Sequence, residues 1–265
     1  MRRKPAQPCG NLHRSALRAA VVCLVLLWAG LGAAASDEDA WRILRESFNY
    51  MRGKSSASTV EMTIHRPGWE RRMTLRGWTQ GERDSIFRVV SPPRDSGNGT
   101  LKKGAEMWTY NPKVNRVIKL PPSMMSQSWM GSDFSNDDLA KSDSLLHDYA
   151  HFLEGTERDE GKTVYLIRSE PLPRAPVIWG LQRLKIREDL VLLEQVFYDE
   201  DRRPVKILVS ESLQMMSGRI FPRRMTMRKV DEPGSFTAVE YLEIQFLESL
   251  PDDLFTITSL KTLKR

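Results

Sequence analysis

Apolar residues recur along this chain at two different spacings, and the first of these is helical. Within residues 36–53 they lie three or four positions apart, at Ala40, Trp41, Leu44, Phe48 and Met51. Such spacing places them along one side of an α-helix. Ser36-Asp37 is typical of a helix start and Gly53 of a helix end, so we expect one amphipathic helix here.

Beyond Gly53, apolar and polar residues alternate, as in a sheet with one buried face. The alternation recurs in residues 60–65, 72–76, 84–90, 106–110, 117–120, 163–169, 182–187, 194–198, 205–210, 223–229 and 237–246. Short stretches rich in Pro, Gly, Asn and Asp separate most of these segments, and helix-length crossovers between them are missing. We therefore predict ten or eleven strands in an antiparallel meander, forming one domain over residues 36–265.

Residues 121–153 interrupt the alternation. The segment carries five large apolar residues without a clear period: Met124, Met125, Trp129, Met130 and Phe134. Methionine and tryptophan side chains adapt to apolar partners of variable shape. Asn136 begins a stretch typical of a helix start. We predict that this segment forms a lid or plug over a dry region of the sheet.

The first 35 residues resemble a secretory signal peptide. Five basic residues and no acidic ones are combined with the apolar run of residues 19–31 and the small residues Ala33-Ala34-Ala35. This order matches the charged, apolar and cleavage regions of an export signal, so we predict cleavage after Ala35 and a periplasmic location.

Removing that segment changes the charge and the cysteine content. The whole chain carries 40 basic and 34 acidic residues, a net charge of +6, whereas residues 36–265 carry 35 and 34. A nearly neutral domain does not favour a nucleic-acid partner. Both cysteines, Cys9 and Cys23, also lie in the first 35 residues, which excludes thiol chemistry and thiolate metal sites from the remainder.

The best candidate for an enzymatic site is the pair His147 and His151. Four positions apart on a helix, they would share a face and could hold zinc, with Asp148 where zincins carry their catalytic glutamate. The alternative is a solvated segment before a turn at Gly155. A third zinc ligand is not marked by spacing, and the sequence contains no complete nucleophile elbow or phosphate-binding glycine loop. We expect no enzyme and no cofactor.

Three acidic residues, Asp133, Asp137 and Asp138, raise the question of a hard cation. They lack the alternating spacing of a calcium loop. Carboxylates at the start of a helix are favoured by capping and by the helix dipole, so we interpret this group as helix capping.

Two segments resemble those of a known family. They are Trp108-Thr109-Tyr110-Asn111-Pro112 and the run from Gly131 to Leu139, G-S-D-F-S-N-D-D-L. With Leu250-Pro251-Asp252-Asp253-Leu254-Phe255 nearer the end, they make the sequence similar to the outer-membrane lipoprotein-sorting proteins of the LolA/LolB-like superfamily. The resemblance spans nearly all of residues 36–265.

The resemblance implies a mainly β (α+β) fold, in which a curved antiparallel sheet forms an incomplete barrel plugged by helices. It also implies a periplasmic carrier that takes acyl chains of a lipoprotein or lipid into a hydrophobic cavity and receives or delivers them through an inner-membrane exporter complex. An envelope sensor that uses the same cavity to regulate a membrane partner is the alternative. No motif places the cavity arginine of the well-characterised carrier in this sequence.

The expected cavity residues come from one strand and from the lid. We predict ligand contacts at Trp108, Tyr110, Met124, Met125, Trp129, Met130 and Phe134. We expect the carrier to be a monomer, with lipid and a membrane transporter as its partners.

Overall fold

The computed structural model describes residues 37–263, and in them thirteen antiparallel strands form one sheet. The strands are β1 (Ser55–Arg66), β2 (Trp69–Gln80), β3 (Asp84–Ser91), β4 (Gly99–Lys103), β5 (Glu106–Asn111), β6 (Arg116–Lys119), β7 (Tyr149–Asp159), β8 (Lys162–Pro171), β9 (Leu181–Arg187), β10 (Leu192–Tyr198), β11 (Pro204–Met216), β12 (Arg219–Lys229) and β13 (Phe236–Leu247). The predicted signal segment lies outside the described residues.

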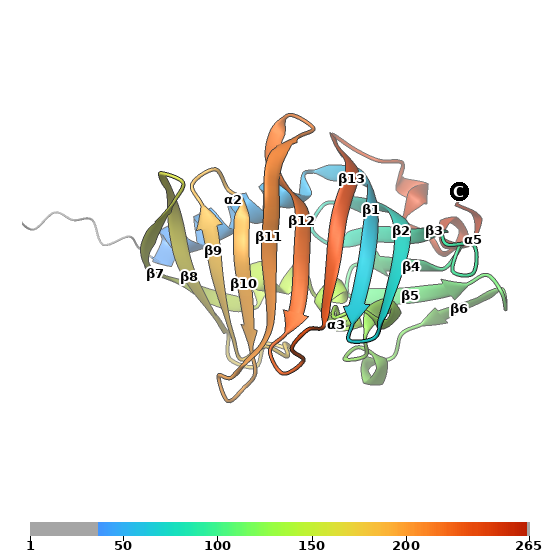
Figure 1. Ribbon diagram of the computed structural model, residues 1–265, viewed down its shortest axis with the longest axis horizontal. Coiled ribbons are helices and arrows are strands. Elements are labelled where there is room, and N and C mark those ends of the chain that lie inside the picture. Colours follow the sequence, from blue (N-terminus) through green and yellow to red (C-terminus); the bar gives the residue numbers. More distant parts are fainter. Residues whose placement is uncertain (1–36, 264–265) are drawn as a thin grey trace, which may run out of the picture. The chain divides into compact units, whose positions relative to one another are not determined.

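Strand order follows chain order on both sides of one central junction. The order is β6-β5-β4-β3-β2-β1-β13-β12-β11-β10-β9-β8-β7. The first and last strands therefore meet in the middle, paired from Ser55 with Leu247 to His65 with Phe236. Because the outer strands β6 and β7 do not pair with each other, the curved sheet is an incomplete barrel, and the predicted mainly β meander is confirmed (Figure 1).

The leading helix α2 (Asp37–Arg52) forms where the apolar spacing predicted it. Acidic residues occupy its first turn and Arg52 its last, which complements the helix dipole. It ends at Gly53, whose φ of 72° suits glycine, and a Cβ there would lie 2.7 Å from the Phe246 ring. Leu44 faces the sheet, whereas Trp41 is 40% exposed.

The helix packs on one half of the sheet. Ala40, Ile43 and Leu44 form a buried cluster with Ile167 of β8 and with Leu184 of β9. In Figure 1 the helix runs behind these strands, on the same side of the sheet as the segment that interrupts the meander. Helical elements therefore cover one face of the sheet.

Two strands were not predicted from the sequence. In β4, Gly99 to Lys102 are all buried, so no alternation is visible. In β7 the register shifts between Leu153 and Gly155, which interrupts the period of two. The predicted lid over residues 121–153 is correspondingly shorter, because β7 begins at Tyr149.

Residues 121–148, called the plug below, contain four short helical turns: η1 (Pro122–Met124), η2 (Trp129–Gly131), α3 (Asn136–Ala140) and α4 (Ser144–His147). The predicted helix start at Asn136 is confirmed. The Ser135 hydroxyl accepts from the Asp138 N–H while the Asp138 carboxylate accepts from the Ser135 N–H, which is a capping box.

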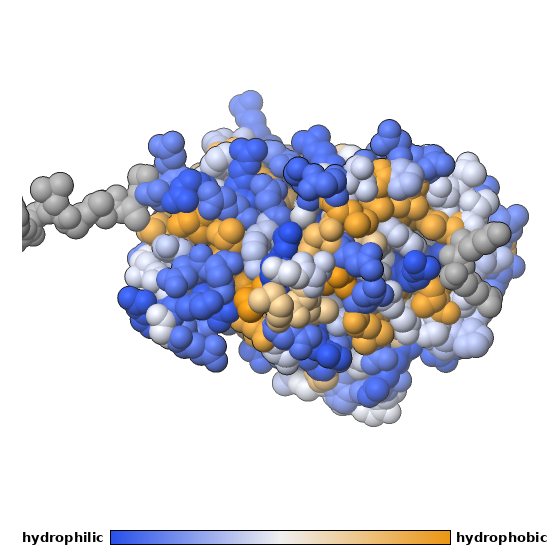
Figure 2. Space-filling view, turned by 90° about the horizontal axis from the view of Figure 1, so that it is seen from above, coloured by the Kyte–Doolittle hydropathy of each residue, from blue (hydrophilic) through white to orange (hydrophobic). Residues whose placement is uncertain are grey.

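The last segment, η3 (Asp252–Leu254) and α5 (Ile257–Thr262), covers the other half of the sheet. Phe255 and Leu260 are buried against Ile86, Leu101 and Tyr110. No helix within residues 37–263 has the length and hydropathy needed to span a bilayer. Seen from above, hydrophobic residues lie among hydrophilic ones across the surface (Figure 2).

Candidate functional site

A cavity of about 390 Å³ lies between the sheet, α2 and the plug. We call it the central cavity. Its apolar lining comes from α2, from the plug, from the loop before β9 and from strands β9 to β13, and includes Leu44, Phe48, Phe134, Trp179, Leu184, Phe197, Leu208, Phe221, Met225, Met227 and Ile244. Its volume is within the range of about 300–1,000 Å³ that small-molecule sites occupy. The arrangement can hold an apolar ligand.

The strand residues of this lining follow the pleat of the sheet. Met225 and Met227 lie two positions apart on β12 and point to the same side, toward the cavity. Phe197 of β10 stacks at a tilt on Trp179, with ring centroids 5.3 Å apart. The alternation predicted these strand faces as buried, but nothing in it distinguishes a cavity wall from a filled core.

The plug side of the central cavity is polar. Asp138 reaches the sheet, where Lys206 Nζ of β11 lies 2.7 Å from its Oδ2. The Lys206 ammonium also lies 5.2 Å from the centre of the Trp179 ring. Asp137 pairs with Lys141 at 3.1 Å, and Lys141 Nζ donates to the Pro176 carbonyl. Both carboxylates are thus neutralised by lysines.

Tyr149 adds a hydroxyl to this polar side. Its O–H donates to the Trp179 carbonyl at 3.0 Å, and burial raises the pKa of Tyr149 to about 12. The nearby Gln195 Nε2 donates to Gln182 Oε1 at 2.6 Å. At neutral pH the phenol therefore stays protonated and acts as a hydrogen-bond donor.

One arginine lines the central cavity away from the plug. Arg52, the last residue of α2, donates from Nε to the Gly81 carbonyl and from Nη2 to the Asp84 carbonyl. Burial lowers the pKa of Arg52, and burial raises the pKa of the neighbouring Tyr241 phenol. No sequence motif marks this residue, since a basic residue at a helix end is ordinary.

The seven residues predicted to contact ligand are divided among different parts of the structure. Phe134 lines the central cavity. Four others line a second cavity, of about 410 Å³, between the plug and strands β2 to β5: Tyr110, Met124, Trp129 and Met130. Met125 packs against the buried cluster that contains Trp129, and Trp108 packs against the cluster formed with the C-terminal segment. A role in ligand contact stays a prediction for all seven.

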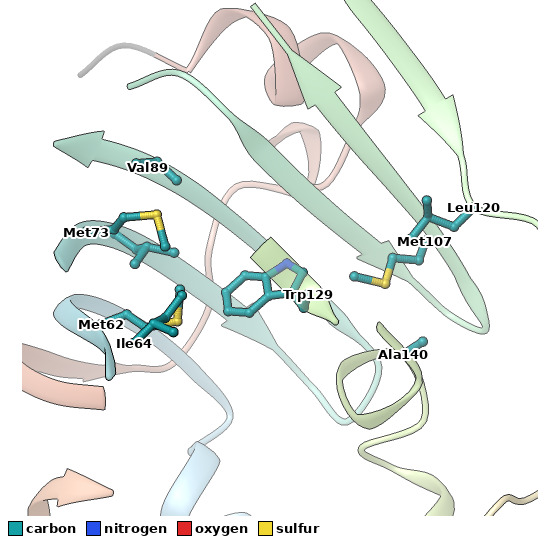
Figure 3. Close-up of a cluster of buried hydrophobic side chains, with 9 residues drawn as sticks. Met62, Ile64, Met73, Val89, Met107, Leu120, Trp129 and Ala140 are labelled. Atoms are coloured by element: carbon teal, nitrogen blue, oxygen red, sulfur yellow. The ribbon is translucent and has the colours of Figure 1, made fainter. Parts of the chain in front are cut away.

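Trp129 is part of a packed core. Its side chain is 7% exposed and its indole Nε1 donates to Thr100 Oγ1 at 2.9 Å. In Figure 3 the indole lies between Met62 and Met73 on one side and Met107 on the other. Methionine sulfur beside an aromatic ring is a favourable contact.

The histidine pair does not share a helix face, so the geometry on which the zinc hypothesis depends is absent. His147 ends α4 and its Nε2 lies 2.8 Å from Glu82 Oε2, whereas His151 is buried in β7 with Nδ1 2.8 Å from Ser169 Oγ. Burial lowers the pKa of His151 to about 4. Within the described part of the chain, no three His, Cys, Asp or Glu side chains are grouped to hold a metal ion.

The acidic residues of the plug do more than cap a helix. Capping holds for Asp138, but Asp133 is fully buried and forms a two-pronged ion pair with Arg66, at 2.9 and 3.1 Å. Asp143 pairs with the buried Lys102 at 2.9 Å. Asp133, Asp138 and Asp143 therefore each bind a cation of a different strand and fix the plug to the sheet.

Comparison with known proteins gives the fold a context. A family model described as an uncharacterized protein matches residues 81–262. The structure of a DUF1329 family protein from Desulfovibrio piger is 23% identical, with a TM-score of 0.75, over 84% of this chain and 98% of that one. No curated protein matches.

Two further solved structures have the same fold. A putative outer membrane lipoprotein-sorting protein domain from Vibrio parahaemolyticus is 19% identical, with a TM-score of 0.72, over 85% of this chain and 100% of that one. A LolA superfamily protein from Nitrosomonas europaea is 22% identical, with a TM-score of 0.69, over 83% and 98%.

Proposed function

We propose that the chain, which belongs to the family whose model matches residues 81–262 and has the fold of a LolA superfamily protein and of a putative outer membrane lipoprotein-sorting protein domain, is a carrier of acyl chains. The observation that supports this most directly is the apolar central cavity between the curved sheet, α2 and the plug. The acyl chain of a lipoprotein or of a free lipid occupies this cavity while it crosses water towards the outer membrane.

Burial of the acyl chain supplies the binding energy. Each methylene removed from water contributes about 0.8 kcal/mol, so a chain with about 15 of them offers roughly 12 kcal/mol before the costs of ordering. The methionines of the lining, such as Met225 and Met227, re-pack at low cost around chains of different length. Such a carrier needs no catalytic residue and no cofactor.

The site of action follows from the first residues of the chain. We propose that residues 1–35 are a signal peptide cleaved after Ala35 and that the domain works in the periplasm as a monomer. Cargo is loaded or released at an inner-membrane exporter complex, which is the kind of partner such carriers meet.

Filling the central cavity tests the proposal. Ser58 lines it from β1, and Ser58→Trp places an indole where the acyl chain would lie. The matched control is Thr59→Trp, on the next residue of the same strand and outside the cavity lining. Native mass spectrometry of periplasm-purified protein and titration with a fluorescent fatty acid measure binding.

We expect bound lipid in the wild type and in Thr59→Trp, and at least a tenfold loss of affinity in Ser58→Trp. A wild-type protein that is ligand-free and does not bind the fluorescent fatty acid would contradict the carrier function. Equal binding by the two tryptophan variants would place the ligand elsewhere.

A further inference from the structure

The central cavity contains an arginine that no carboxylate pairs with directly. Arg52 lines the cavity from the end of α2, and its Nε and Nη2 donate to two neutral acceptors, the carbonyls of Gly81 and Asp84. Its Nη1 has no acceptor among residues 37–263, and it keeps accessible surface, since it is not one of the buried polar atoms without a partner. The N–H groups of Nη1 are therefore available to a ligand.

The acidic residues nearest to Arg52 are held by other groups. Asp143, Asp84 and Glu82 act on Arg52 through space, but none of them forms an ion pair with it. Asp143 is held by Lys102 at 2.9 Å, Glu82 by a histidine and Asp84 by a backbone N–H. Burial lowers the pKa of Arg52, as expected for a charge that leaves water without a close counter-ion.

Hydroxyl groups of three strands line the same cavity. Ser56 of β1 and Thr79 of β2 are paired across the strands, and their hydroxyls lie 2.8 Å apart. Ser58 lies two residues further along β1, on the same side of the sheet. On β13, the Tyr241 phenol lines the cavity and feels the charge of Arg52. The hydroxyls of Ser58 and Tyr241 have no partner among residues 37–263 and keep accessible surface, so both can bind a ligand.

The charged groups on the plug side of the cavity differ from Arg52, because they form pairs. Asp138 lies 2.7 Å from Lys206, and Asp137 lies 3.1 Å from Lys141. A ligand charge of either sign would have to compete with these pairs. At Arg52 an anionic group gains a charge-assisted hydrogen bond without breaking an ion pair, whereas a cationic group is repelled.

We propose that the central cavity selects lipids that carry a compact anionic head group, a carboxylate or a phosphate, and that this group binds Arg52 Nη1. The hydroxyls of Ser58 and Tyr241 are further donors to the head group, and the acyl chain lies along the apolar strands. This inference rests on the proposed carrier function and names a free anionic lipid as its cargo.

Amphiphiles with the same twelve-carbon chain and different head groups test the wild-type protein. The probes are laurate, dodecyl phosphate, 1-dodecanol and dodecylamine, each displacing the neutral dye N-phenyl-1-naphthylamine at about pH 8, where the amine is protonated. We expect the two anions to bind about tenfold more tightly than the alcohol, as a hydrogen bond between charged groups implies, and the amine to bind most weakly. Comparing laurate with dodecyl phosphate tells whether the cavity prefers a carboxylate or a phosphate.

Two variants identify the groups that select the anion. Arg52→Met removes the charge, so the affinities for laurate and dodecanol should become about equal. Tyr241→Phe removes only a hydroxyl and keeps the ring edge-on to Phe221, with centroids 5.0 Å apart; it should reduce the preference for laurate about threefold. The matched controls are Arg219→Met and Tyr50→Phe, whose side chains also donate to backbone carbonyls but lie outside the cavity lining. Both should keep the wild-type order of affinities.

The outcomes separate the two proposals. Equal binding of the anions and the alcohol by the wild type would overturn the selection by Arg52 and leave the carrier function intact. A preference for anions that survives in Arg52→Met would overturn it as well. Failure of the dye and all four probes to bind would overturn the carrier function itself. If Arg52→Met does not fold, the wild-type order decides the question together with Tyr241→Phe, in which an unchanged preference would count against the proposal.

Discussion

Removing the carboxylate of Asp133 should loosen the plug and destabilise the whole domain. The side chain is fully buried and makes three hydrogen bonds: two from Arg66, at 2.9 and 3.1 Å, and one from the Thr237 hydroxyl at 2.6 Å. Its own N–H donates back to Thr237 Oγ1. Asp133→Ala therefore leaves a guanidinium and a hydroxyl without their acceptor.

The expected loss of stability depends on the hydrogen bonds that Arg66 keeps. Breaking a buried ion pair by removing one partner costs about 3–5 kcal/mol. Arg66 is 16% exposed and still donates to the carbonyls of His65 and Phe236, so we expect the lower end, about 3 kcal/mol. The double variant Arg66→Met with Asp133→Leu should cost less than Asp133→Ala alone, because no buried charge is left unpaired.

Urea unfolding, followed by circular dichroism, measures the free energy of unfolding, and Glu248→Ala is the control. Glu248 pairs with Lys54 at 2.7 Å, but both side chains are more than 70% exposed, so solvent screens the pair and its loss should matter little. If Asp133→Ala costs no more than Glu248→Ala, the pair does not hold the plug. A double variant that is less stable than Asp133→Ala would also refute the reasoning.

Two further variants test other buried side chains. Burial lowers the pKa of His151 from 6.5 to about 4, so between these pH values the unfolded chain binds more protons than the folded one. The free energy of unfolding should therefore be about 2 kcal/mol lower at pH 5 than above pH 6.5. This part of the pH dependence of urea unfolding should disappear in His151→Gln. Trp129→Ala should lower the free energy of unfolding by about 3–5 kcal/mol, because the indole fills a core between methionines. Trp129→Phe should lower it clearly less in the same assay. Equal and small losses for the two variants would mean that Trp129 is not part of the hydrophobic core.

The pattern of apolar residues predicted most of the fold for a physical reason. A helix or a half-buried strand repeats its environment every 3.6 or 2 residues, and α2 and eleven of the thirteen strands retain that period. The two strands that were missed lack it. Gly99 to Lys102 of β4 are buried on both faces, where Lys102 reaches Asp143, and β7 shifts register at Gly155.

The site was less predictable because the plug turns inside its own apolar run. Met130 and Gly131 have φ values of 53° and 80°, so the chain reverses between Trp129 and Phe134. Trp129 consequently enters the methionine core, whereas Phe134 lines the central cavity. A reversal of this kind has no period, and composition cannot say which side chain goes to which side.

The carboxylates of the plug, rather than its apolar residues, show how the plug is attached to the sheet. Asp133 and Asp138 are five residues apart, both are buried, and each meets a cation of the sheet, Arg66 or Lys206. Every oxygen of Asp133 has a donor, so that pair is complete and its effect is structural. Asp138, a residue of the central cavity wall, keeps one buried oxygen without a donor among residues 37–263. Since losing either carboxylate would leave a cation of the sheet without its partner, both ion pairs fix the plug to the sheet from positions that no apolar period marks.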